Sequence, residues 1–366
     1  METVLITFLK NWKRLCSNCH NLTGRKRKIR NKEADMDKNT GSQAFAIPPF
    51  EDGDRVTFFG DSITRNGESI TRTAAYYRRV FPERKVRFFN IGISGATVSA
   101  AHIFFEDWLA RLRPTRVVLA FGVNDAAFAI VTGKTGDTEA EKRKADDAVA
   151  RFESEYERLI DRIRDIGAGV AAIRTPTPFA EGASGQGAQL FGRGAAQRRM
   201  ADSVRRIAQR YSLPLVDDHA FLSARLASGE DLFNDDHVHP NEKGQWRLAE
   251  NFLRAQGLAM DDFQPFAEVA AEAGLAAWHE TAVSLTFIPS TEWLILHGEA
   301  LPYDEKLAKV KKWLDDNEGK ADVNPAFVRF SREYLRNKPR EAELRAVEEA
   351  FAMNTTRVDL SLSRNF

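Results

Sequence analysis

Between residues 54 and 262 the chain alternates between short apolar runs rich in β-forming residues and longer stretches with helical spacing. Five runs have the length and composition of buried strands: 55–60, 86–92, 116–122, 169–175 and 213–217. The intervening helices are expected at 70–81, 101–111, 145–166, 195–211 and 242–256. Strands that alternate with helices form right-handed βαβ units. The pattern therefore predicts an α/β fold in which helices cover both faces of a five-stranded parallel sheet.

The alternation ends near residue 262, and the rest of the chain is mostly helical. Helices are expected there at 263–280, 304–317, 325–337 and 339–353, and the apolar run at 283–288 is interpreted as an interruption. The predicted organisation is a basic, poorly ordered extension at 1–45, an α/β domain at 46–262 and a mostly helical C-terminal extension at 263–366. A lid and an oligomer contact are the two roles considered for the C-terminal extension.

The net charge of +1 conceals a basic N-terminus, because residues 1–35 contain nine Lys or Arg and three Asp or Glu. The nearly neutral net charge gives no reason to expect nucleic-acid binding, and the basic N-terminus is interpreted as a solvated tail. Cys16 and Cys19 both precede the α/β domain, so no disulfide is expected within it. No apolar run approaches the ~20 residues that span a bilayer. The first residues lack the layout of a secretory signal. A cytoplasmic location is the default expectation, with export as the alternative if translation starts downstream, for example at Met36.

Chemically suitable side chains follow three of the predicted strands, at the carboxyl ends where functional residues of parallel sheets gather. The first strand ends at 60–62 (Gly-Asp-Ser), which places the Ser62 hydroxyl at the start of a helix. The second runs into a glycine-containing segment at 90–97, and glycine lets the backbone approach a ligand closely. The third ends at 122–125 (Gly-Val-Asn-Asp), where the Asn124 amide can donate to an oxyanion.

A fourth polar segment lies late in the chain, at 234–241 (Asn-Asp-Asp-His-Val-His-Pro-Asn). Asp236 precedes His239 by three residues, and a carboxylate at that spacing can reach the imidazole and fix its tautomer. The four segments together supply a nucleophile, a base, an orienting acid and oxyanion donors. These are the groups that acyl transfer requires.

In this order, the four segments resemble the sequence blocks of the SGNH (GDSL) hydrolase family over roughly residues 54–260. The resemblance implies a three-layer α/β/α, flavodoxin-like fold to which the helical region is a C-terminal addition. It also implies a serine esterase that needs no metal or cofactor. The roles it assigns are Ser62 as nucleophile, His239 as base and Asp236 as the acid that orients the base. The expected oxyanion hole consists of the Ser62 and Gly95 N–H groups and the Asn124 side-chain amide.

Neighbouring residues compete for these roles. Gly92 lies in the same block as Gly95, but the family's oxyanion glycine aligns with Gly95. Asp235 and His237 stand beside the favoured pair, whereas the family spacing, with a proline directly after the histidine, favours His239.

The other histidines have no such pattern. His219 is expected to have a loop or capping role after the fifth predicted strand. His102, His279 and His297 are expected on the surface or as satisfied core residues.

Several further motifs are given structural interpretations. The segment 16–20 (Cys-Ser-Asn-Cys-His) matches the c-type haem attachment pattern, but no haem pocket or export signal accompanies it. The basic run at 25–30 is interpreted as a solvated tail. The segment 133–135 (Gly-Lys-Thr) lacks the upstream glycine of a phosphate loop, and the glycine-rich stretch at 182–194 is expected to form a flexible loop near the active-site rim.

The leading prediction is hydrolysis of a small-molecule or carbohydrate ester. Deacetylation of a sugar or polysaccharide is preferred, because no segment looks like a long acyl channel. Lysophospholipase and thioesterase activities are alternatives within the family, and a catalytically inactive binding protein on the same fold is the alternative outside it. No nucleic-acid partner and no transmembrane segment are expected, and the oligomeric state is left open.

Overall fold

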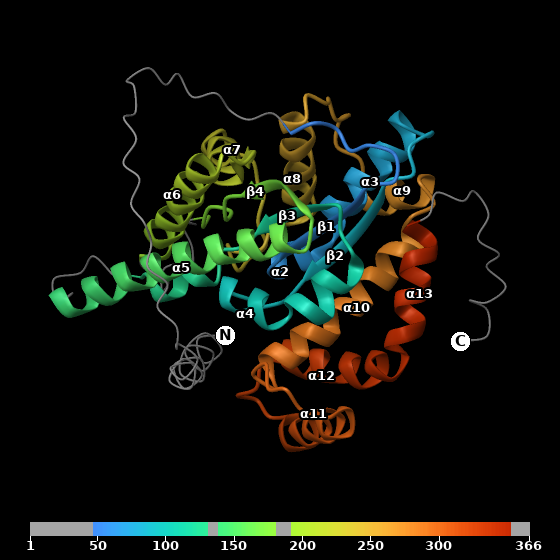
Figure 1. Cartoon of the computed structure of the whole chain (residues 1–366). Helices are drawn as coiled ribbons and strands as arrows, with labels where there is room; N and C mark the ends of the chain where they lie inside the picture. The colour runs from blue at the N-terminus through green and yellow to red at the C-terminus, as the bar shows by residue number, and fades with distance from the viewer. Residues whose placement is uncertain (1–46, 131–137, 181–191, 353–366) are drawn as a thin grey trace.

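Five parallel strands form one sheet in the part of the chain that the computed structural model describes, residues 47–130, 138–180 and 192–352 (Figure 1). The strand order is β2-β1-β3-β4-β5, the order of a flavodoxin-like sheet, and the predicted α/β fold is confirmed. β1 lies between β2 and β3, so that Phe58 is level with Asn90 on one side and Val118 on the other. The strands are β1 (Arg55–Gly60), β2 (Arg87–Gly92), β3 (Arg116–Ala120), β4 (Gly169–Arg174) and β5 (Leu215–Val216).

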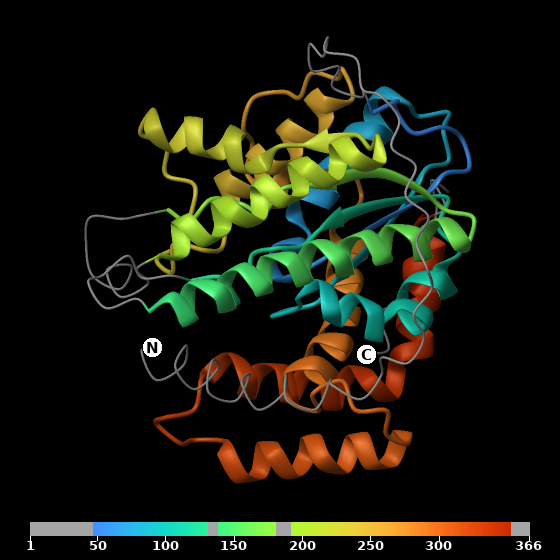
Figure 2. The same ribbon diagram turned by 60° about the vertical axis from the view of Figure 1, so that its left-hand side comes forward.

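Helices cover both faces of the sheet because alternate strand residues point to opposite sides. Phe58 and Val118 belong to a core shared with α3 and α8, whereas Phe59 and Leu119 belong to a core shared with α4, α5 and α6. Figure 2 shows the long α5 crossing in front of the strands. The helices of this part are α2 (Ser62–Asn66), α3 (Glu68–Val80), α4 (Val98–Ile103), α5 (Glu139–Asp165), α6 (Arg193–Tyr211), α7 (Asp218–Ala227) and α8 (Glu242–Ala255).

Two helix predictions in this part need correction. The single helix expected at 101–111 is divided into α4, a π-helical turn at Phe105–Leu109 and a 3-10 turn at Ala110–Leu112. Helix α7 was not predicted. It begins because the Asp217 carboxylate accepts the Ala220 N–H at 3.0 Å, and it includes His219 in its first turn rather than leaving it in a loop.

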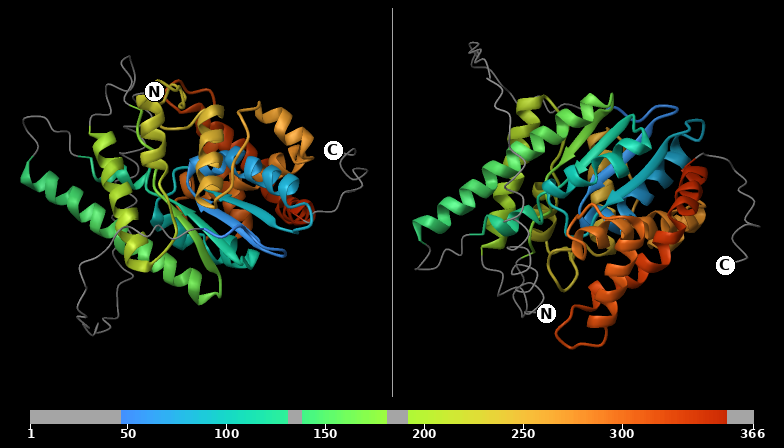
Figure 3. Two further views of the ribbon diagram at one scale, coloured as in Figure 1. Left: turned by 90° about the horizontal axis from the view of Figure 1, so that it is seen from above. Right: turned by 60° about the horizontal axis from the view of Figure 1, so that its bottom comes forward.

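The C-terminal helices gather on one side of the α/β part (Figures 2 and 3), with α11 farthest from the sheet. Both α10 and α13 contact β2, which is an edge strand. They thereby cover an edge that would otherwise be open to pairing with another chain. These helices are α9 (Phe266–Glu272), α10 (Ala276–Leu294), α11 (Tyr303–Asn317), α12 (Pro325–Asn337) and α13 (Glu341–Ala352).

The run 283–288 does not interrupt the helical region, as the sequence had suggested, but lies inside α10. The break comes earlier, between α9 and α10, where Gly274 adopts a left-handed conformation with φ of 63°. Helix α10 is buried along most of its length, so it lacks the polar face that makes a helix recognisable from its sequence.

Some sequence predictions fall outside the described residues: the basic extension at 1–45, the segment at 133–135 and most of the glycine-rich stretch at 182–194. Within the described residues, none of the helices combines the length and the apolar character that crossing a membrane requires.

Candidate active site

Ser62 begins α2 directly after β1, at the carboxyl end of the sheet. The preceding Asp61 caps this helix, since its Oδ1 accepts the Ile63 N–H at 2.9 Å. The turn is tight: a Cβ on Gly60 would lie 2.2 Å from Thr64 Oγ1 and 2.6 Å from Ala120 O. Only glycine fits there, and the result is a partly exposed Ser62 hydroxyl at the first turn of a helix.

A chain of hydrogen bonds joins Ser62 to His239 and Asp236. The Ser62 Oγ lies 2.8 Å from His239 Nε2, and His239 Nδ1 lies 2.6 Å from Asp236 Oδ2. A carboxylate can only accept, so the proton of the neutral imidazole sits on Nδ1. Nε2 is then free to accept the Ser62 proton.

Asp236 is held in its ionised form. Burial acts to raise the pKa of its carboxyl, but the hydrogen bond from the His239 ring and the charge of that ring outweigh burial. The backbone N–H groups of Val238 and His239, each 2.9 Å from Oδ1, act in the same direction. The resulting pKa is about 2, so Asp236 is a carboxylate at any pH at which an esterase would work.

The loop that carries this pair, residues 228–241 between α7 and α8, is closed on itself. The Asn234 N–H and side-chain amide both donate to His239 O, at 2.9 and 3.1 Å, and Phe233 forms an antiparallel bridge with Pro240. Asn241 caps α8 by accepting the Gly244 N–H at 3.0 Å, and its own amide donates to Asp231 O at 3.3 Å. These bonds fix the backbone on both sides of His239.

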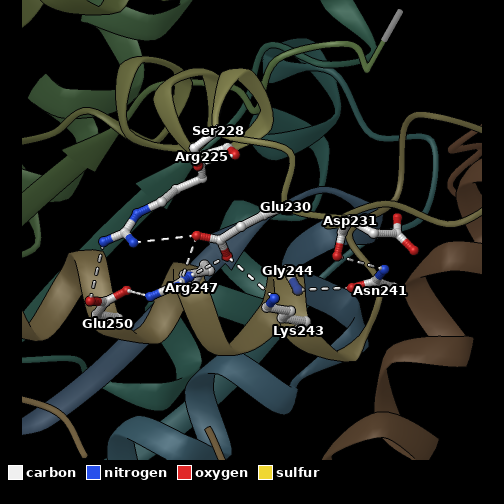
Figure 4. A network of polar contacts seen from close by, with 9 residues as sticks. All are labelled: Arg225, Ser228, Glu230, Asp231, Asn241, Lys243, Gly244, Arg247 and Glu250. Atoms are coloured by element: carbon white, nitrogen blue, oxygen red, sulfur yellow. Dashed lines mark hydrogen bonds and ion pairs between the residues drawn. The ribbon is translucent and has the colours of Figure 1, made fainter. Parts of the chain in front are cut away.

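An ion-pair network ties the start of this loop to the flanking helices (Figure 4). Glu230 receives a bidentate pair of hydrogen bonds from Arg247 of α8, both 2.9 Å, and a further one of 3.3 Å from Arg225 of α7. Glu250 lies 2.7 Å from Arg247 and 3.6 Å from Arg225, so that each of the two glutamates pairs with both arginines. Bidentate arginine–carboxylate pairs impose a defined geometry, so the network holds the start of the loop between the last turn of α7 and the middle of α8.

The segment after β2, residues 93–97, is called here the β2–α4 loop. Gly95 is its one partly exposed residue and has φ of 72°, a left-handed conformation that favours glycine. Gly92 has a different function. A Cβ there would lie 2.0 Å from the Arg65 N of α2, and its N–H already donates to Asn90 Oδ1 at 2.9 Å. Gly92 therefore allows the end of β2 to pack against α2, whereas Gly95 is partly exposed.

Asn124 and Asp125, which follow β3, reach across to this loop. The Asn124 Nδ2 donates one hydrogen to Ala96 O at 2.9 Å, and an amide nitrogen carries a second. The Asp125 Oδ1 accepts the Val98 N–H at 3.2 Å. Burial raises the Asp125 pKa to about 8. The structure thus joins Ser62, His239 and Asp236 by hydrogen bonds. It places Gly95 and Asn124 after β2 and β3, the two strands that flank β1.

His237 and Asp235, the residues that compete with His239 and Asp236 for the catalytic roles, make no hydrogen bond to Ser62 among those that the structure describes. The His237 ring lies against Phe179, with ring centroids 6.3 Å apart, and its backbone is left-handed with φ of 59°. Asp235 is exposed at the surface of the loop.

Among the other histidines, His279 Nδ1 is hydrogen-bonded to Thr71 Oγ1 at 2.9 Å, and His102 Nε2 to Glu155 O at 3.0 Å. Burial lowers the pKa of both rings to about 4. Both are satisfied residues of the packed structure.

Sequence reasoning missed two charged groups beside the site. Burial raises the pKa of Asp61 to about 6, against the lowering effects of the Ile63 N–H and of the charges of His239 and Arg193. Arg193, the first residue of α6, is 5% exposed, and burial lowers the pKa of its guanidinium while Asp236 and Asp61 act in the opposite sense. Arg193 stands in no recognisable motif, and Asp61, although it is part of Gly-Asp-Ser, was given no role of its own. The position of both groups beside the site arises only in the folded chain.

The sequence model of the GDSL-like Lipase/Acylhydrolase family matches residues 58–247, just over half of the chain. No curated protein is a significant match. Among solved structures, a variant of Axe2, an acetyl xylan esterase from Geobacillus stearothermophilus, is 23% identical with a TM-score of 0.47, covering 58% of this chain and 99% of that one. LAE5, an alpha/beta hydrolase enzyme from the metagenome of Lake Arreo, Spain, is 24% identical with a TM-score of 0.45 and the same coverage. The match to the family model is decisive: the chain belongs to the GDSL-like lipase/acylhydrolase family and is an ester-hydrolysing enzyme.

Proposed function

We propose that this chain is a serine carboxylesterase in which Ser62 is the nucleophile, His239 the general base and Asp236 the group that orients the base. The observation that carries the proposal is the continuous hydrogen-bonded chain from Ser62 Oγ through both ring nitrogens of His239 to the Asp236 carboxylate. An ionised Asp236 fixes the tautomer and stabilises the imidazolium that forms when His239 takes the proton.

The proposed oxyanion hole consists of the Ser62 and Gly95 N–H groups and the Asn124 amide. Ser62 is the first residue of α2, so its N–H has no acceptor within the helix and is aligned with the positive end of the helix dipole. Asn124 uses one amide hydrogen on Ala96 O and has one left for substrate. The left-handed conformation and partial exposure of Gly95 support its N–H as the third donor.

The reaction then has two halves. His239 accepts the Ser62 proton as Oγ attacks the ester carbonyl, and the tetrahedral oxyanion is stabilised by the three donors. The C–O bond to the alcohol breaks as His239 returns the proton to the leaving oxygen. Water, deprotonated by His239, next attacks the acyl-enzyme, and Ser62 leaves with the proton to regenerate the resting state.

We further propose a short acyl group on a larger, polar alcohol such as a carbohydrate. Ile63, Val123 and Val238, each next in sequence to a proposed site residue, pack together with Phe179 in one small apolar cluster. An apolar surface of this size suits a short acyl group better than a long chain. The His239 side chain, in contrast, is 44% exposed, which suits an alcohol portion that extends into solvent.

A substrate panel with wild type and Ser62→Ala tests both parts of the proposal. Wild type should hydrolyse nitrophenyl acetate and acetylated sugars, and Ser62→Ala should lose at least about a thousandfold in kcat. Retained turnover in Ser62→Ala would reject the assigned nucleophile. A strong preference for nitrophenyl octanoate over the acetate would reject the short acyl group and leave the nucleophile standing.

A further inference from the structure

We infer that helix α10 of the C-terminal region positions the proposed oxyanion hole, with Ser290 and Trp293 as the positioning residues. This inference rests on the proposed function, because it assigns a purpose to contacts with the Gly95 turn. It also gives the C-terminal helices a role in catalysis that differs from the two roles considered from the sequence, a lid and an oligomer contact.

Two side chains of α10 bond to consecutive backbone groups of the β2–α4 loop. The Ser290 Oγ accepts the Ser94 N–H at 2.9 Å, and the Trp293 Nε1 donates to Gly95 O at 3.0 Å. These two groups belong to the peptide units on either side of the one that carries the Gly95 N–H. Fixing both neighbouring peptides therefore fixes the direction in which that N–H points.

Both positioning residues are buried and lie on the same face of α10, since they are three residues apart. Ser290 is fully buried, and Trp293 is 8% exposed within the apolar core that also holds Ile93 and Ala96. Their hydrogen bonds are therefore shielded from water, where competition by solvent would weaken them.

The opposite face of α10 is anchored to the helices behind it. Glu292 lies 2.7 Å from Lys306 and 3.1 Å from Lys338, and it accepts the Tyr334 hydroxyl at 3.2 Å. The Thr291 hydroxyl donates to Phe330 O at 3.0 Å. The four consecutive residues 290–293 thus connect the β2–α4 loop on one side with α11, α12 and the 3-10 turn Lys338–Arg340 on the other.

Helices α10 and α12 also contact α2, the helix that begins with Ser62. The Arg65 guanidinium stacks on Phe287 of α10, 4.1 Å from the ring centroid, and on Phe330 of α12, at 4.8 Å. One group of packed helices therefore contacts both the helix that starts with the proposed nucleophile and the loop that bears a proposed oxyanion donor. Their relative position determines how well that donor meets the developing charge.

Four single substitutions in the full-length enzyme form the test, two at the positioning residues and two matched controls. Ser290→Ala and Trp293→Phe remove the hydrogen-bonding groups; the serine change loses little volume, and the tryptophan control below matches the volume that Trp293→Phe removes. Trp278→Phe changes another buried tryptophan of α10, whose Nε1 has no partner, and Ser331→Ala changes a fully buried serine of α12, whose hydroxyl has none. Hydrolysis of nitrophenyl acetate gives kcat and KM, and labelling with a fluorophosphonate counts active sites.

Ser290→Ala and Trp293→Phe should each lower kcat per labelled site about tenfold with KM within about twofold, because a displaced donor weakens binding of the transition state rather than of the substrate. The two controls should keep the wild-type kcat. The inference is overturned if kcat per labelled site in the two test variants equals that of the controls, or if only the labelled fraction falls, which would indicate a folding role alone. Retained turnover in Ser62→Ala would instead reject the proposed function, and this inference with it.

Discussion

The buried ion pair of Arg174 and Asp218 allows a direct test of how buried charges contribute to the stability of the α/β part. Arg174, the last residue of β4, donates from Nε and Nη2 to the two carboxylate oxygens of Asp218 at 2.6 and 2.9 Å. The Asn251 amide of α8 donates to the same carboxylate at 2.9 Å, and Arg174 Nη2 also donates to Leu248 O at 2.8 Å. The side chains of the pair are 7% and 3% exposed.

Asp218→Ala should lower the free energy of unfolding by about 3–5 kcal/mol, because it leaves a buried guanidinium without its counter-charge. For a domain of this size that corresponds to a fall in Tm of about 10 °C. Urea denaturation followed by tryptophan fluorescence measures the loss. Replacing both partners, as Arg174→Met with Asp218→Leu, should recover most of it, since no charge is then stranded.

A matched control is the exposed pair Lys312 and Asp316, whose nitrogen and oxygen are 2.8 Å apart with side chains 76% and 53% exposed. Asp316→Ala should leave the denaturation midpoint unchanged, because water screens this pair and takes its place readily. If Asp218→Ala cost less than about 1 kcal/mol, or no more than Asp316→Ala, the argument from burial would be wrong.

Two further predictions concern the site. His239→Ala should lower kcat at least about a thousandfold, whereas His237→Ala should stay within about tenfold of wild type because the His237 ring lies against Phe179; equal losses in a nitrophenyl acetate assay would reverse the assignment. The Asp61 carboxyl, with its pKa raised from 3.8 to about 6 by burial, favours folding in its protonated form, so its contribution is complete below pH 3.8 and is lost as the pH rises through 6. Asp61→Asn keeps a neutral cap, and its stability relative to wild type should rise by roughly 2 kcal/mol between pH 4 and pH 7 in urea denaturation; an unchanged difference would contradict the raised pKa.

The strands and their ends could be predicted from the sequence because each is a compact apolar run bounded by glycine or polar residues. The fifth strand is the exception: a run of five residues was expected at 213–217, but only Leu215 and Val216 pair as a strand. Pro214 has no N–H to donate to the ladder, although its carbonyl accepts the Ile173 N–H at 3.0 Å. Proline shortens the pairing without changing the apolar pattern.

Contacts between residues that are far apart in the sequence could not be predicted. Helix α10 is apolar on most sides because it packs against β2, α12 and α13 together, and a short apolar run inside such a helix has no distinguishing period. Ser290 and Trp293 carry no motif, and their partners lie almost 200 positions earlier in the chain. Similarly, Glu230 and Arg247 are ordinary charged residues until the 228–241 loop folds back between α7 and α8.

The position of β2 at the edge of the sheet explains why α10 is placed to act on the active site. The inner side of the β2–α4 loop is held by Asn124 and Asp125, which arrive from the end of β3. No strand lies on the outer side, because β2 is the last of the described sheet. Whatever covers that edge must also form the outer wall of the loop, and α10 does both. Stabilising the edge strand and orienting the Gly95 peptide are therefore two consequences of one packing arrangement. Substitutions that loosen residues 290–293 of α10, such as Trp293→Phe, should affect the free energy of unfolding and kcat together, whereas Ser290→Ala should lower kcat with little loss of stability.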